Sequence, residues 1–580
     1  MINFRNYPQL TKVVMPSNIQ LSNKIFSNAF VNMQNLHHVD LHKNITNMDN
    51  CFRNCKNIVS VTHGDKNNIT SMNYAFAHCS NLTTTIGGRN VRYMASTYYN
   101  CPNIKTAFCS DMVTYMDSTY RDCKNLTNAA CGNNVIYMND TYMNCTSLLT
   151  PVCGPNVTNM SNTYQGCKNL QVAICGDKVK NIRNAYRDCI SLTAPVCGPN
   201  VSMMDYAYYN CTNLKSMVIG NKVSNLEYAY YNCYKMVGTP VCPNSAKSMN
   251  GVYWNCRNLT GSPVCSNNVT NMANAYNGCV NLTGSPVFGN NVYNVAGAYY
   301  NCYKLTGTPI IYDSMRYMDQ TYSNCQNLTG SPVCHENIAG LAGTYNNCRN
   351  LTGSPVCGNK VYSLTNTYAN CVNLTGPAIA GTNVKQAAYA YYGCTNIGGN
   401  AYFMSTGIQN VAYCFGNIGH RINLYVPADS LTNRACHGNT YQGTDIIGTG
   451  ISWKNDTTNN CYYNASKNIY VYYVEDVAAA KEANENPQPE EPTSTITFTQ
   501  YVEDRFSSDT VTFTAEANMT WNNFVYSDYN ADGLYNASDG EYVYYNVMFD
   551  YYQVYADENY SIPVLVSDKI INGHTYYVSR

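Results

Sequence analysis

The chain has 580 residues with 35 basic and 35 acidic side chains, so its formal net charge is zero. Only 12% of the residues are charged, about half of the usual share. Such a surface argues against nucleic acid as a partner, because phosphate binding requires a basic face. The polarity comes from Asn, Thr, Ser and 55 Tyr. These residues suit sugar recognition and equally suit a stack of repeats with Asn ladders, and we prefer the second interpretation.

No segment approaches the roughly 20 consecutive apolar residues of a membrane span, so we expect no membrane insertion. The N-terminal sequence MINFRNYPQLTKVVMP lacks the basic and then apolar pattern of a signal peptide. We therefore expect a protein made in a cytosol and not exported by the general secretory route. Residues 1–30 contain an imperfect copy of the repeat that follows and predict an N-terminal cap.

Residues 31–418 are a repeat array in which one cysteine recurs. The period is 22 residues up to Cys233, apart from one step of 24, and 23 residues afterwards. Met33 and Gly416 occupy the same position one period outside the series, which gives about 18 coils. The cysteine column consists of Cys55, Cys79, Cys101, Cys123, Cys145, Cys167, Cys189, Cys211, Cys233, Cys256, Cys279, Cys302, Cys325, Cys348, Cys371 and Cys394.

Other apolar positions repeat with the same period as the cysteine. An aromatic residue lies three positions before it, as in Phe52 and Tyr98, and Leu, Ile or Met lies three positions after it. Seven positions before it the residue is usually Met, as in Met72. A column that is always apolar faces inward, and units of this size bury an apolar face only by stacking. The fold class is therefore a repeat solenoid with coils of 22–23 residues.

Within each coil we expect one short parallel strand at the end of the motif, in sequences such as SPVC. Proline recurs in this segment and removes a backbone donor, so these strands must be short. The segment M-x-x-A-Y-x-x-C has apolar residues at i, i+3, i+4 and i+7 and predicts a short helical turn on the opposite wall.

A second cysteine column lies at the end of the predicted strand. Ile219, Phe288, Ile311 and Ala380 replace cysteine at this position, so it requires a small or apolar side chain and not a bond partner. We therefore interpret both columns as reduced, buried ladders, although stacked cysteines would also be close enough to oxidise. The second column contains Cys109, Cys131, Cys153, Cys175, Cys197, Cys242, Cys265, Cys334 and Cys357.

The motifs NVTNMSNTYQGCKNL (156–170) and NVTNMANAYNGCVNL (268–282) resemble the BspA-like leucine-rich repeats and the related Mycoplasma-type surface-protein repeats. The chain departs from that pattern by using Tyr where those repeats commonly have Phe. The resemblance implies a leucine-rich-repeat-like solenoid that is used for binding, often to cells or host surfaces. It implies no catalysis.

Residues 419–474 predict a C-terminal cap of the solenoid, and INLYVPADSL (422–431) resembles the strand that often closes BspA-like arrays. Residues 475–496 are rich in Ala, Pro and Glu and predict an extended linker, with a helical start as an option.

Residues 497–580 predict a separate small β-rich domain. TFTAEANMTWNNFVYSDYNADGLY (512–535) and the closing VSDKIINGHTYYV resemble a module at the C-terminus of structural proteins of Firmicutes phages. This resemblance implies a virion protein made in the host cytoplasm.

The acidic sequence at Asp528, Asn530, Asp532 and Asp539, with Gly533 at its turn, fits the spacing of a calcium loop. A strand-like run follows it, and Asp539 is shorter than the usual Glu, so we favour the interpretation without a metal. Histidines are scattered without zinc spacing, and we expect no other cofactor. Nucleophile and phosphate-loop motifs are absent, and the acidic residues of the array form no column. We therefore expect a protein that is not an enzyme.

Extra tyrosines lie beside the aromatic column and alternate with Asn, Gln and Arg, so we expect them on the solvent side. They are either ordinary surface residues, which we prefer, or a binding stripe, and no binding residue is assigned. These tyrosines are Tyr99, Tyr209, Tyr231, Tyr300 and Tyr392.

Together these features predict a non-enzymatic virion protein of a tail, baseplate or head fibre that contacts the bacterial surface. Its expected partners are other virion proteins and a surface glycan or protein receptor, with a homo-oligomer as an option. The alternative is a bacterial BspA-type cell-surface adhesin, and a third interpretation is an intracellular scaffold.

Overall fold

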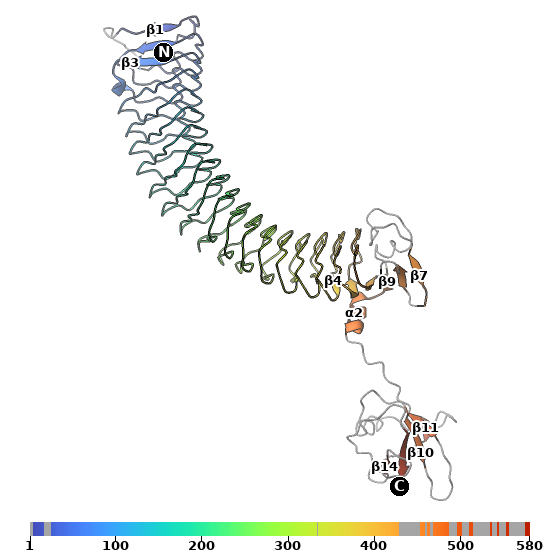
Figure 1. The fold of residues 1–580 in the computed structure, drawn as a ribbon. Helices are drawn as coiled ribbons and strands as arrows, with labels where there is room; N and C mark the ends of the chain where they lie inside the picture. The colour runs from blue at the N-terminus through green and yellow to red at the C-terminus, as the bar shows by residue number, and fades with distance from the viewer. Residues whose placement is uncertain are drawn as a thin grey trace. The chain divides into compact units, whose positions relative to one another are not determined.

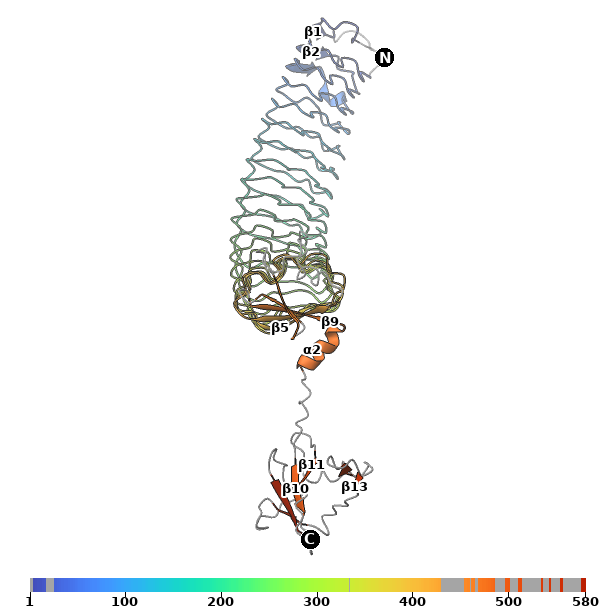
Figure 2. The same cartoon turned by 90° about the vertical axis from the view of Figure 1, so that its right-hand side faces the viewer.

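The computed structural model describes residues 4–16, 25–332, 334–428, 453–458, 461–464 and 468–485, and the backbone of six strands beyond them. The chain divides into two compact units, Met1–Val477 and Ala478–Arg580. The first unit is a curved stack of coils (Figure 1), which Figure 2 shows after a quarter turn. The predicted solenoid is therefore confirmed, and the predicted domain boundaries remain predictions.

A column of isolated parallel bridges runs along the stack, one residue before the methionine position. It begins with Ile25 and Asn47, ends with Gln386 and Asn410, and joins each coil to the next. Among the described residues of the array, regular strands at the expected position, the end of the motif, form only near its two ends. At the N-terminal end, β1 (Lys12–Val14), β2 (His38–Leu41) and β3 (Ser60–His63) form a parallel sheet. The 24-residue coil holds its extra residues around the 3₁₀-helix η1 (Lys66–Asn68).

The C-terminal end of the array is closed by a mixed sheet of six strands in the order β4-β5-β6-β9-β8-β7. Its first four strands run parallel, and β8 and β7 are antiparallel to their neighbours. The bounds are β4 (Ala378–Ala380), β5 (Gly399–Phe403), β6 (Ile422–Pro427), β7 (Lys454–Asp456), β8 (Cys461–Asn464) and β9 (Ile469–Val474). Helix α2 (Val477–Glu485) follows, within the predicted linker.

In the second unit, the described backbone that follows helix α2 consists of strands. A four-stranded sheet has the order β11-β10-β15-β14, with β10 and β15 parallel, and β12 pairs with β13. The bounds are β10 (Ile496–Gln500), β11 (Thr510–Phe513), β12 (Leu534–Tyr535), β13 (Tyr542–Val543), β14 (Gln553–Tyr555) and β15 (Thr575–Ser579).

The segment between the methionine and the cysteine differs from the predicted helical turn, because it is a series of separate turns. In the coil of Cys79, the amides of Ala75, Ala77 and Cys79 donate to the carbonyl three residues earlier, and the alternate amides donate to the next coil. The residues five and one before the cysteine have positive φ in coil after coil, for example Tyr74 (54°) and His78 (64°). A helix contains no such residues, and i, i+3 spacing does not distinguish a helix from successive turns.

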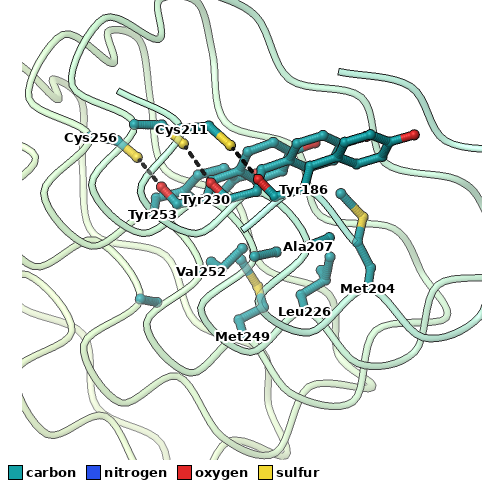
Figure 3. Packing of buried hydrophobic residues seen from close by; sticks show 14 of the residues in the cluster. Tyr186, Met204, Ala207, Cys211, Leu226, Tyr230, Met249, Val252, Tyr253 and Cys256 are labelled. Atoms are coloured by element: carbon teal, nitrogen blue, oxygen red, sulfur yellow. Dashed lines mark hydrogen bonds between the residues drawn. The ribbon is translucent and has the colours of Figure 1, made fainter. Parts of the chain in front are cut away.

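A ladder of stacked aromatic rings fills the core. Every ring lies 4.5–5.9 Å from the next, centroid to centroid, at interplanar angles of 1–19°. Figure 3 shows Tyr186, Tyr230 and Tyr253 above the methionine column, at Met204 and Met249. The ladder runs from Phe4, Phe30, Phe52 and Phe76 through the tyrosines from Tyr98 to Tyr391 and ends at Phe415.

The buried hydroxyls explain why most rings are Tyr and not Phe. In eleven of the tyrosines the hydroxyl accepts a hydrogen bond from the amide, and donates one to the carbonyl, of the residue twelve positions earlier. This residue precedes the second cysteine column, where proline and the lack of regular strands leave backbone groups unpaired. The tyrosines are Tyr98, Tyr120, Tyr142, Tyr164, Tyr186, Tyr208, Tyr230, Tyr253, Tyr276, Tyr299 and Tyr322.

Each thiol of the cysteine column donates to the carbonyl of the aromatic residue one coil earlier, at 2.8–3.3 Å, as from Cys256 to Tyr230 in Figure 3. All cysteines that the structure describes are free, and this column is fully buried. In the last coil Ile418, and not Gly416, occupies the cysteine position, because Phe415 stacks on Tyr391 and the final step is 24 residues. Counting the period failed there because no cysteine marks the coil.

Candidate binding surface

The turn between the methionine and cysteine columns presents two outward positions per coil, five and two residues before the cysteine. The first has positive φ throughout the array, a conformation that favours Asn, Asp and Gly. Most coils place Asn, Ser, Gly or Gln at the first position, as at Asn162 and Gln320, and the second position accepts small residues such as Ala77 and Ser323. A large side chain at these positions is therefore unnecessary for the fold.

In three successive coils these positions hold aromatic residues whose rings touch. Tyr209 stacks on Tyr231 at 4.4 Å and 8°, and Tyr206 stacks on Tyr228 at 5.1 Å and 18°. Trp254 lies edge-on to Tyr231 at 5.4 Å and 6.2 Å from Tyr228. All five side chains are half-buried at the surface. We call them the aromatic cluster.

Gly251 makes room for this cluster. It occupies the position that holds Tyr228 one coil earlier, and its φ is +59°. A Cβ atom on Gly251 would lie 2.6 Å from the Tyr228 ring, closer than van der Waals contact allows. The local sequence is therefore adjusted to seat the aromatic side chains.

Arg187 covers the N-terminal side of the cluster. Its guanidinium carbon lies 4.6 Å from the centroid of the Tyr209 ring and 5.9 Å from that of Tyr206, within the range of cation–π attraction. Burial raises the pKa of Tyr209, and the nearby Tyr231 acts in the same direction. The Tyr209 phenol thus stays uncharged at neutral pH.

Polar side chains border the aromatic cluster beside Arg187. We call Asn184, Arg187 and Asp205 the polar margin. The Asp205 carboxylate, whose side chain is 6% exposed, pairs with Arg183 at 2.9 Å. Burial raises the pKa of the Asp205 carboxyl, and Arg183 opposes this shift. Among the described residues, three buried polar atoms of this margin lack a hydrogen-bond partner: Asn184 Oδ1, Arg187 Nε and Asp205 Oδ1. Buried polar atoms without partners are rare in folded proteins and require an explanation.

The five tyrosines singled out in the sequence are all half-buried at the surface. The structure brings Tyr209 and Tyr231 together, whereas Tyr99 lies against His78 and Arg121, and Tyr392 lies against Tyr389. Tyr300 belongs to none of these groups. Sequence reasoning missed Tyr206 and Tyr228 because it considered only the position two residues before the cysteine, and it missed Trp254 because it considered only tyrosines at that position. The Asn, Asp and Gly residues just before the cysteine were the available signal.

Asp528, Asn530, Asp532 and Asp539 of the candidate calcium loop lie outside the described residues. Within the part of the chain that the structure describes, no group of three or more His, Cys, Asp or Glu side chains is placed to hold a metal ion. Burial raises the pKa of the Cys55 thiol to about 12, which leaves almost no nucleophilic thiolate at neutral pH. No helix among the described residues has the length and apolar character needed to cross a bilayer.

A stack of short coils with an inward Leu column and parallel bridges between coils defines a solenoid of the leucine-rich-repeat class. The profile of the BspA type leucine rich repeat region (6 copies) matches residues 2–126, 49–171, 182–306 and 273–398. These matches cover more than half of the chain, which therefore belongs to this family. The predicted resemblance to BspA-like repeats is thus confirmed.

The chain is also similar to two solved bacterial structures. One is a leucine-rich repeat protein from Bacteroides ovatus, with 14% identity, coverage of 67% of this chain and 86% of that chain, and a TM-score of 0.34. The other is a leucine rich cell surface protein from Faecalibacterium prausnitzii, with 14% identity, coverage of 68% and 87%, and a TM-score of 0.29. No curated protein matches the chain.

Proposed function

We propose that this protein is a non-enzymatic adhesive solenoid that presents the outward side chains of its coils to a receptor on the bacterial surface. The observation that carries the proposal is the contrast between constant inward columns and variable outward positions. The inward columns build the same core in every coil, whereas the outward positions gather five aromatic side chains into one cluster. Aromatic and Arg side chains dominate the energetics of protein recognition surfaces.

The particle that carries the protein is the second part of the proposal. The resemblance of residues 512–535 to the phage module supports a structural protein of a virion, on a tail, baseplate or head fibre, with other virion proteins as partners. The family supports the alternative, a BspA-type adhesin of a bacterial cell surface. In both cases the array is the receptor-binding part.

Immunogold electron microscopy with an antibody to this chain tests both parts on a lysate that contains cells and particles. Gold on phage particles is the expected result, and its position would identify head or tail. Gold on cell envelopes, with bare particles, would replace the virion by the bacterial adhesin. Gold confined to the cytoplasm would contradict adhesion itself.

A further inference from the structure

We propose that the aromatic cluster and its polar margin bind an uncharged polysaccharide of the bacterial surface. The inference rests on the proposed adhesive function and specifies its receptor class. The site consists of the five rings of the cluster together with Asn184, Arg187 and Asp205.

The shape of the cluster fits a polymer more than a small molecule. The five rings belong to three successive coils, so the apolar surface extends along the stack. Tyr and Trp side chains combine an apolar body with a polar tip. A pyranose has the same division, with an apolar C–H surface and a rim of hydroxyl groups, so both parts of the sugar find matching chemistry.

The margin offers both kinds of hydrogen-bonding group. The side chains of Asn184 and Asp205 carry acceptor oxygens, whereas the Arg187 guanidinium, which lies 3.6 Å from Asp188, carries donors. A hydroxyl group both donates and accepts, so the hydroxyl rim of a sugar matches both kinds of group.

The charges at the margin exclude an anionic polymer. Arg183 is balanced by Asp205 at 2.9 Å, and Arg187 is balanced by Asp188 at 3.6 Å. Glu227 adds a further carboxylate next to Tyr228 and accepts a hydrogen bond from Ser248. A polymer of phosphates or uronic acids would meet this carboxylate without a free cation to offset it.

The repeat itself supplies substitutions that preserve the fold. Tyr209→Gln, Tyr231→Asn and Trp254→Asn introduce residues found at the same position in other coils, at Gln165, Asn277 and Asn346. Tyr300→Asn at that position, outside the cluster, is the matched control. Asp205→Ala is a second, independent variant, because Ala273 and Ala296 occupy its position elsewhere. Circular dichroism and thermal unfolding verify that each variant is folded.

The experiment measures binding of the full-length protein to dextran, mannan, galactan and the neutral polysaccharide released from the bacteria to which it adheres. Polygalacturonate is the anionic comparison. We expect the wild type and Tyr300→Asn to bind a neutral polymer equally, and the triple variant to bind at least about tenfold more weakly. Asp205→Ala should also weaken binding, and polygalacturonate should not bind.

Three outcomes would overturn the inference while leaving adhesion intact. The first is adhesion to whole cells that survives periodate oxidation of their glycans, which would indicate a protein receptor. The second is wild-type affinity of the triple variant for the neutral polymer. The third is a dimer in sedimentation analysis that only the triple variant loses, which would make the cluster an interface between two copies of the chain. Failure of the wild type to adhere to any cell would instead contradict the proposed function.

Discussion

The hydroxyl of Tyr230 accepts a hydrogen bond from the amide of Val218 at 3.0 Å and donates one to the carbonyl of the same residue at 2.7 Å. One buried side chain therefore satisfies both backbone groups of a residue that lies outside any regular strand. At Tyr391 the hydroxyl is buried without a hydrogen-bond partner among the described residues, and the residue twelve positions earlier, Ile379, belongs to β4.

We predict that Tyr230→Phe lowers the free energy of unfolding by about 1–3 kcal/mol, because it leaves a buried donor and acceptor unpaired. Tyr391→Phe is the matched control and should be neutral or stabilising, because it removes an unpartnered hydroxyl. Urea denaturation followed by circular dichroism measures both. Equal losses in the two variants would show that the hydroxyl contacts are not the cause.

Gly251→Ala should disturb the aromatic cluster, because the new Cβ atom meets the Tyr228 ring at 2.6 Å. Gly343→Ala carries the same backbone strain at φ +64°, but its nearest neighbour is Gln320 Cγ at 3.3 Å. We expect both to lose about 1 kcal/mol from strain and only Gly251→Ala to change the fluorescence of Trp254. Identical spectra for the two variants would contradict the described packing of Tyr228.

Asn301 precedes Cys302 and has a φ of +61°. We predict that Asn301→Val lowers the free energy of unfolding by about 1–2 kcal/mol or more, because β-branched residues strongly disfavour this conformation. Asn301→Gly should be tolerated, since Gly278 and Gly393 occupy the same position. Thermal unfolding compares them with Lys304→Val at an exposed neighbouring site. Equal stability of the valine and glycine variants would refute the assignment of left-handed backbone.

High pH should destabilise the array. Burial raises the pKa of the Cys265 thiol from 9.0 to about 12, and it raises the pKa of Tyr276 in the same direction. A group whose pKa is higher in the folded state stabilises fully below its unfolded pKa and loses that contribution as the pH rises toward the folded value. Stability should therefore be constant near neutral pH and fall above about pH 9.

Urea midpoints measured between pH 7 and pH 11 check this expectation. Cys265→Ala should lose less stability across that range than the wild type, because one buried ionisable group has been removed. A midpoint that rises above pH 9 would contradict the described burial of the thiols and phenols.

The periodic columns identify the solenoid from sequence because every coil buries the same residues. The turns between Met72 and Cys79 were mistaken for a helix, since both conformations bring residues i and i+3 together. Only part of the aromatic cluster could be predicted, because the outward tyrosines were sought at a single position of the coil. Tyr209, Tyr231 and Trp254 share that position, whereas Tyr206 and Tyr228 join them through the geometry of the turn.

The aromatic ladder has Phe at its ends and Tyr in its middle. This division determines where the array can gain or lose whole repeats during evolution. Strands close the two ends, while side-chain hydroxyls hold the interior coils. A duplicated 23-residue unit placed between Cys256 and Cys325 would find compatible neighbours on both sides, because each coil contacts only adjacent coils. Gain or loss of whole coils at this place would change the length of the array and the number of its outward positions. The strands that close the two ends would stay in place, so neither end of the core would become exposed.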